Sequence, residues 1–198
     1  MVLAKETNDG SPGTDVQGRR HERTSPAVYG ESMTLSALRR TRQIAADPAT
    51  VWAVITDIDH SAEFLSRVTT VTRRTDGPYG VGTRWQQTRS VLGRPETAKR
   101  TVTVSEPPER TVITTAAQGV QITDEFTLTP SGSGTELSFE CSAPKGAPGG
   151  SAVFAPRLLA RIGARVSSGE LDQDLRDITA EAERRAAAFG RRRPDGAV

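Results

Sequence analysis

The chain has 198 residues, of which 35% are hydrophobic and 25% charged, and it contains a single cysteine. This length allows one domain of ordinary size with terminal tails. A single cysteine excludes an intrachain disulfide, and no apolar run approaches the ~20 residues of a membrane-spanning helix. We therefore expect a cytoplasmic protein with one hydrophobic core and no signal peptide.

The basic surplus lies at the C-terminal end of the sequence. The formal net charge is +2, and residues 184–198 hold five basic residues and one acidic residue. Such a run is typical of a solvated tail, so we predict no nucleic-acid partner. Residues 1–33 and 190–198 are poor in core-forming side chains and are predicted to be disordered. The predicted folded domain is then 34–189.

One strand and two short helices are predicted at the start of this domain. Strand-like alternation covers Ala37–Ile44. Asp47 is a suitable helix N-cap, and Pro48 suits the first helical position because proline lacks an N–H. An apolar stripe at helical spacing follows, made of Val51, Ile55 and Ile58. The next segment can form a shorter helix that turns Phe64 and Leu65 inward.

The residues after Val68 alternate with the period of β-strands. Short turn sequences separate the strand-like segments, namely DGPYGVG, GRPE, the Pro107-Pro108 pair and SGSG. The first of them, with three Gly and one Pro, is predicted to form a tight hairpin with Tyr79 at its tip. Because short turns join antiparallel neighbours, the pattern predicts an antiparallel meander of about six strands.

Helical periodicity returns from Ser151 to the end of the domain. The first part of the apolar stripe comprises Phe154, Leu158 and Ile162, and the second Leu171, Leu175, Ile178, Ala182 and Phe189. The small residues Ser167-Ser168-Gly169 between them can break or bend the helix. The elements together predict an α+β fold, in which one long C-terminal helix covers a curved antiparallel sheet of about seven strands.

Two motifs in this order of elements resemble the SRPBCC superfamily. They are PATVWAVITDIDHSAEF and GVGTRW, and the resemblance covers roughly Leu35–Ala188. Phe64 stands where many relatives have Trp. The superfamily includes START lipid-transfer domains, pollen-allergen-like proteins and polyketide cyclases/dehydrases. The resemblance implies a helix-grip fold with an apolar cavity between the sheet and the long helix.

Strand parity predicts which side chains line the inner face of the sheet, because alternate residues point the same way. The inward-facing residues are Trp85, Gln87, Arg89, Val91, Arg100, Val102, Val104, Ile122, Asp124, Phe126, Leu128, Leu137, Phe139, Cys141 and Ala143. We expect ligand contacts from Trp85, Gln87, Arg100, Val102, Phe126, Phe139, Cys141, Leu158 and Ile162.

The charged residues on this face allow two interpretations, since a buried charge must be paired or solvated. Either Arg89 donates to a carbonyl or enolate oxygen of a ligand, or the arginines form Arg–Asp pairs or lie at a rim. The order Trp85, Gln87, Arg89 resembles inward residues of aromatic polyketide cyclases. That resemblance implies that Arg89 positions a polyketone and stabilises enolate oxygens. Asp124 is the candidate base, and His60 is a weaker one.

Three hypotheses about function remain open on these residues. The leading one is a protein that binds a polyketide-, lipid- or aromatic-like hydrophobic molecule. The first alternative is a polyketide aromatase/cyclase that uses Arg89, and the second is a partner-binding module without a ligand. Cys141 is interpreted as a small buried hydrophobe, and two histidines with one cysteine give no metal-ligand spacing. We therefore expect no metal and no cofactor.

Overall fold

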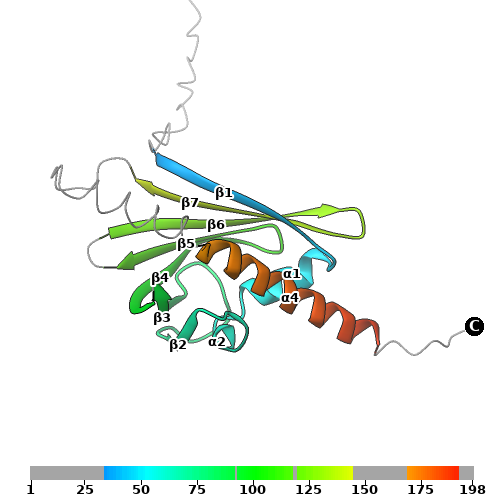
Figure 1. Ribbon diagram of the computed structural model, residues 1–198, viewed down its shortest axis with the longest axis horizontal. Helices are drawn as coiled ribbons and strands as arrows, with labels where there is room; N and C mark the ends of the chain where they lie inside the picture. Colours follow the sequence, from blue (N-terminus) through cyan, green and yellow to red (C-terminus); the bar gives the residue numbers. More distant parts are fainter. Residues whose placement is uncertain (1–33, 92, 118–119, 145–168, 192–198) are drawn as a thin grey trace, which may run out of the picture. The chain divides into compact units, whose positions relative to one another are not determined.

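The computed structural model describes residues 34–91, 93–117, 120–144 and 169–191. These residues belong to one compact unit, Ser32–Val198. The elements in chain order are β1 (Thr34–Ile44), α1 (Pro48–Ile55), α2 (Ser61–Phe64), β2 (Val68–Arg73), β3 (Arg84–Val91), β4 (Arg94–Glu106), β5 (Arg110–Ala117), β6 (Val120–Ser131), β7 (Gly134–Pro144) and α4 (Glu170–Gly190). Figure 1 shows their arrangement.

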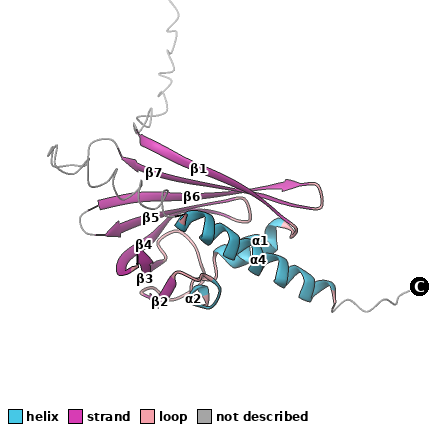
Figure 2. Ribbon diagram, viewed as in Figure 1, coloured by secondary structure: helices cyan, strands magenta, loops and turns pink. Residues whose placement is uncertain are grey.

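Seven strands form one curved sheet in the order β1-β7-β6-β5-β4-β3-β2, and every neighbouring pair is antiparallel. Strands β2 to β7 are neighbours in sequence order, as a meander requires, and β1 closes onto β7. Helices α1 and α4 lie on one face of the sheet (Figure 2). The predicted α+β architecture is confirmed.

Local sequence explains how α1 begins and how β7 approaches β1. Asp47 Oδ1 accepts a hydrogen bond of 2.9 Å from the backbone N–H of Thr50, and Pro48 follows the cap. The hydrogen bond from the Thr50 N–H holds the pKa of the Asp47 carboxyl below its ordinary value. Gly134 lies where a Cβ would collide with the backbone carbonyl of Ile44, so only glycine fits this crossing.

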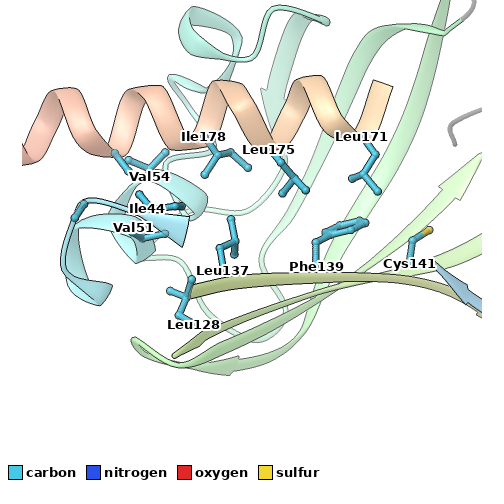
Figure 3. Close-up of a cluster of buried hydrophobic side chains, with 12 residues drawn as sticks. Ile44, Val51, Val54, Leu128, Leu137, Phe139, Cys141, Leu171, Leu175 and Ile178 are labelled. Atoms are coloured by element: carbon cyan, nitrogen blue, oxygen red, sulfur yellow. The ribbon is translucent and has the colours of Figure 1, made fainter. Parts of the chain in front are cut away.

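The core lies between α4 and the inner face of the sheet. Figure 3 shows Leu171, Leu175 and Ile178 of α4 pointing toward Leu137, Phe139 and Cys141 of β7. The buried residues of this cluster are Ile44, Ala46, Val51, Val54, Leu128, Leu137, Phe139, Cys141, Leu171, Leu175, Ile178 and Ala182. Burial of this apolar area, at roughly 25 cal/mol per Å², is the main force that holds α4 on the sheet.

The C-terminal helix differs from its prediction in its last turn. The described helix begins at Glu170, after Gly169 in a left-handed conformation with φ of 65°, so the predicted break falls at this glycine. Phe189 was expected on the buried stripe, but it is 71% exposed, because the last turn of α4 extends beyond the sheet (Figure 1). The predicted stripe residues Phe154, Leu158 and Ile162 lie outside the described residues.

Two further expectations about the strands were wrong. The DGPYGVG segment is not a tight hairpin, because ten residues separate the end of β2 from the start of β3. Val104 does not share a face with Val102, because a register shift between them pairs Val102 with Ile113 but Val104 with Val112. Adjacent residues on β5 point to opposite faces, so one extra residue in β4 inverts the parity.

Replacement of Leu175 by alanine tests the packing of α4. Leu175 is fully buried, so Leu175→Ala should lower the free energy of unfolding by about 2–5 kcal/mol. Urea denaturation followed by circular dichroism measures this change. The matched control is Phe189→Ala on the same helix, whose effect should stay within about 0.5 kcal/mol. Equal effects of the two variants would contradict the assigned core.

Candidate functional site

Strand β3 places a short polar row on the inner face of the sheet. Trp85, Gln87 and Arg89 are only 5%, 5% and 8% exposed, as the alternation along the strand predicts. The Trp85 indole Nε1–H donates to Gln87 Oε1 over 3.2 Å. The amide of Gln87 is thereby oriented, and Trp85 has its polar atom satisfied inside the core.

Arg89 forms a buried ion pair with Asp174 of α4. Its Nη2 lies 2.8 Å from Asp174 Oδ1 and 2.6 Å from Asp174 Oδ2. The two side chains are only 10% and 13% exposed. Arg89 Nε is also buried, yet it has no hydrogen-bond partner among the residues that the structure describes. One donor of this guanidinium is therefore available on the inner face.

The sequence contains a signal for Asp174, although the apolar stripe by itself does not reveal it. Asp174 follows Leu171 by three residues and precedes Ile178 by four, so it lies on the same side of α4 as both. A carboxylate on a buried stripe needs a cation from the facing element. Strand alternation already predicts that Arg89 faces inward, so Arg89 is a candidate for this cation. The sequence does not show where the helix lies relative to the sheet.

Other acidic residues in the first turns of α4 are also paired. Glu170, whose side chain is 1% exposed, accepts a hydrogen bond of 3.1 Å from Arg67. Asp172 lies 3.5 Å from Arg42 of β1. Asp177 accepts from the backbone N–H and the hydroxyl of Ser66, at 2.8 and 2.7 Å. The N-terminal half of α4 is therefore held by polar contacts as well as by its apolar stripe.

A second pair of opposite charges lies further along the inner face. Arg100 Nη2 of β4 is 3.7 Å from Asp124 Oδ2 of β6, and their side chains are 11% and 2% exposed. The Thr115 hydroxyl donates to the same carboxylate oxygen over 3.5 Å. Arg100 is the direct cross-strand neighbour of Trp85. Both predicted inward arginines thus have carboxylate partners, and only the partner of Arg100 was among the predicted residues.

Apolar side chains surround these charges. The rings of Phe126 and Phe139 pack edge to face with centroids 5.0 Å apart. Cys141 is buried in the same cluster as Phe139, and Val102 is buried beside Trp85 in a second cluster. The candidate ligand contacts from β3, β4, β6 and β7 therefore share one face of the sheet. Leu158 and Ile162 fall outside the described residues.

The position of Tyr79 was also predicted wrongly. It does not lie at a hairpin tip but packs against the cluster of Trp85 and Val102, and its ring meets that of Trp52 edge to face at 6.1 Å. The hydroxyl groups of Tyr79 and Thr111 are 2.7 Å apart. Thr111 uses its single proton on the Val104 carbonyl, so Tyr79 is the donor. Loop residues have no periodicity that reveals an inward ring.

His60 belongs to the surface of the molecule. Its side chain is 63% exposed, and Nδ1 lies 2.7 Å from Asp57 Oδ1. This hydrogen bond raises the pKa of the imidazole above its ordinary value. Asp57 is also bound by Arg185 of α4 at 2.8 Å. His60 therefore takes part in a surface network that joins the end of α1 to α4, and it is not part of the inward-facing row.

In the described ranges no three His, Cys, Asp or Glu side chains are grouped so that they could hold a metal ion. None of the described helices combines the length and the apolar character needed to cross a membrane.

Ionisation of Tyr79 is a direct test of its burial. Desolvation raises the pKa of its phenol to about 12, against the hydrogen bond to Thr111 and the positive charge of Arg100, which lower it. The free energy of unfolding should therefore fall as the pH rises from about 10 to about 12, because only the unfolded state loses this proton there. Absorbance of the phenolate in a Tyr29→Phe variant isolates Tyr79. A midpoint near 10 would contradict the buried position, and Tyr79→Phe is the control.

Comparison with known proteins gives one family and a set of similar folds. The family model described as polyketide cyclase / dehydrase and lipid transport matches residues 37–183. No curated protein matches the chain. Among solved structures, the ZhuI aromatase/cyclase from Streptomyces sp. R1128 aligns with a TM-score of 0.62 at 19% identity, covering 78% of this chain and 98% of that one.

Two further structures share the fold. The di-domain aromatase/cyclase StfQ of the steffimycin biosynthetic pathway aligns with a TM-score of 0.60 at 18% identity over 76% of this chain. The match covers 52% of StfQ, so this chain spans about half of that protein. Ara h 8.0201 aligns with a TM-score of 0.53 at 11% identity, over 77% of this chain and 98% of that one. The fold is the helix grip, and the chain belongs to the polyketide cyclase/dehydrase and lipid transport family of the SRPBCC superfamily.

Proposed function

We propose that this protein binds an apolar small molecule that carries an oxygen acceptor, and that Arg89 is its polar anchor. The observation that carries the proposal is the buried Nε–H of Arg89, which lacks a hydrogen-bond partner among the described residues. A buried donor without a partner costs about 1–3 kcal/mol, and more when it is charged. A ligand oxygen at this position removes that cost, so the free donor favours binding.

The surroundings of Arg89 support a ligand with a large apolar body. Trp85, Val102, Phe126 and Phe139 supply the apolar surface of the same sheet face, and small-molecule sites typically combine such surface with a few polar groups. The family description names polyketides and lipids, and the similar structures include aromatase/cyclases. An aromatic, polyketide-like molecule matches both the aromatic rings and the guanidinium donor.

The described outer face of the sheet gives no support to a partner-binding module. Its side chains form polar pairs, such as the hydrogen bond from Arg110 Nε to Glu125 Oε1 at 2.7 Å. The exposed large hydrophobic residues of the described chain are Val81 and Phe189, which lie in a loop and at the end of α4. They form no contiguous apolar patch of the kind that marks a protein interface.

Removal of Arg89 tests the proposal. Because Arg89→Leu alone would leave Asp174 buried without its cation, the double variant Arg89→Leu/Asp174→Leu is the appropriate change. We expect it to fold and to bind methyl 2-naphthoate at least about tenfold more weakly, through loss of one charge-assisted hydrogen bond. Trp fluorescence titration measures the affinity.

The matched control is Arg84→Leu, an exposed arginine on the opposite face of β3. It should bind the ester as the wild type does. Native mass spectrometry of the protein purified from its own host then identifies any bound molecule. Equal affinity of the double variant and the wild type for the ester would refute Arg89 as the anchor.

A cyclase activity is the second candidate, and the contact between Arg89 and Asp174 favours it. A fixed cation can stabilise an enolate oxygen, and a carboxylate beside it can accept a proton. Asp124 beside Arg100 offers the same combination. If the protein is a cyclase, it should convert a poly-β-ketone into an aromatic product, and Arg89→Leu/Asp174→Leu should lower the rate at least about 100-fold while Arg84→Leu does not. Failure of the wild type to convert the ketone rejects this candidate.

A further inference from the structure

The charges of the inner face are balanced within the described part of the chain. Arg89 faces Asp174, and Arg100 faces Asp124, each pair with side chains that are at most 13% exposed. Glu96 is the direct cross-strand neighbour of Arg89, so its side chain projects from the same face of the sheet. The two inward guanidiniums therefore present no surplus of positive charge to a ligand.

This balance limits the kind of ligand oxygen to which Arg89 can donate a hydrogen bond. Nη2 already donates to both oxygens of Asp174, and the Nε–H of the same planar group is buried without a partner among the described residues. A ligand oxygen at Nε lies only a few ångströms from the Asp174 carboxylate. An uncharged carbonyl, ester or phenol oxygen is tolerated there, whereas a carboxylate is repelled in a site that water screens poorly.

We propose that Asp174 is a specificity-determining residue, which makes the Arg89 site select ligands with an uncharged oxygen and reject carboxylates. This inference rests on the proposed function and adds the charge class of the ligand to it. Asp174 acts through Arg89, because it occupies the position on the guanidinium that an anionic ligand would otherwise take. The residue also belongs to α4, so charge selection and helix attachment depend on the same side chain.

The test compares two probes that differ in charge, methyl 2-naphthoate and 2-naphthoate, at neutral pH. The ester enters any apolar site more readily, so the informative quantity is the ratio of the two dissociation constants in each variant. Asp174→Asn keeps the shape of the side chain and removes its charge. We expect it to shift the ratio toward the acid at least about tenfold, because Arg89 then loses the carboxylate that contacts it.

Two control variants separate the effect of the Asp174 charge on Arg89 from a general effect of changing the charge of α4. Asp172→Asn makes the same change of charge on α4, next to Arg42 instead of Arg89, and should leave the ratio unchanged. Arg89→Gln/Asp174→Asn removes both charges and should lose the shift toward the acid. Thermal unfolding of each variant shows that the helix is still in place.

The outcomes distinguish this inference from the function on which it rests. If the wild type binds the ester but Asp174→Asn leaves the ratio unchanged, or Asp172→Asn shifts it equally, the role of Asp174 is refuted and ligand binding stands. If neither probe binds the wild type or any variant, the proposed function fails, and the inference fails with it.

Discussion

The packing of α4 on the inner face of the sheet is the interaction on which the rest of the structure depends. Leu175 and Ile178 cover β7, and this contact buries the apolar side of both elements. The same placement brings Asp174 to Arg89 across the interior. Apolar burial supplies most of the free energy, and the ion pair adds a fixed orientation, since opposite charges in a poorly screened interior tolerate little displacement.

The order of elements and most of the inner face could be predicted because they follow from local periodicity. Alternation along β3 correctly turned Arg89 inward, and helical spacing correctly placed Leu175 in the core. The errors arose where local periodicity stops. The register shift after Val102 changes which residues of β4 face inward. The end of α4 extends beyond the sheet, so Phe189 is exposed. Tyr79 lies in a loop, which has no periodicity, and packs against the core.

The pairing of the site residues was the part that sequence could not supply. Strand alternation shows that Arg89 and Asp124 face inward. It does not show that the carboxylate partner of Arg89 is Asp174, on a helix more than eighty residues later in the chain. That contact depends on the axial position of α4 against β3, which is a tertiary property. Similar structures do not supply this information either. At 18–19% identity they establish the fold but do not show which charged residues of this chain form pairs.

The sheet is not closed into a barrel, so β1 and β2 are its two edges among the described strands. An open edge presents unpaired N–H and C=O groups that can recruit a strand from another molecule. Here β1 carries Arg39, Arg40 and Arg42, and β2 ends in Arg73. Charged side chains along an open edge disfavour the addition of a strand from a second molecule, so these arginines are expected to lower the tendency of the edges to aggregate.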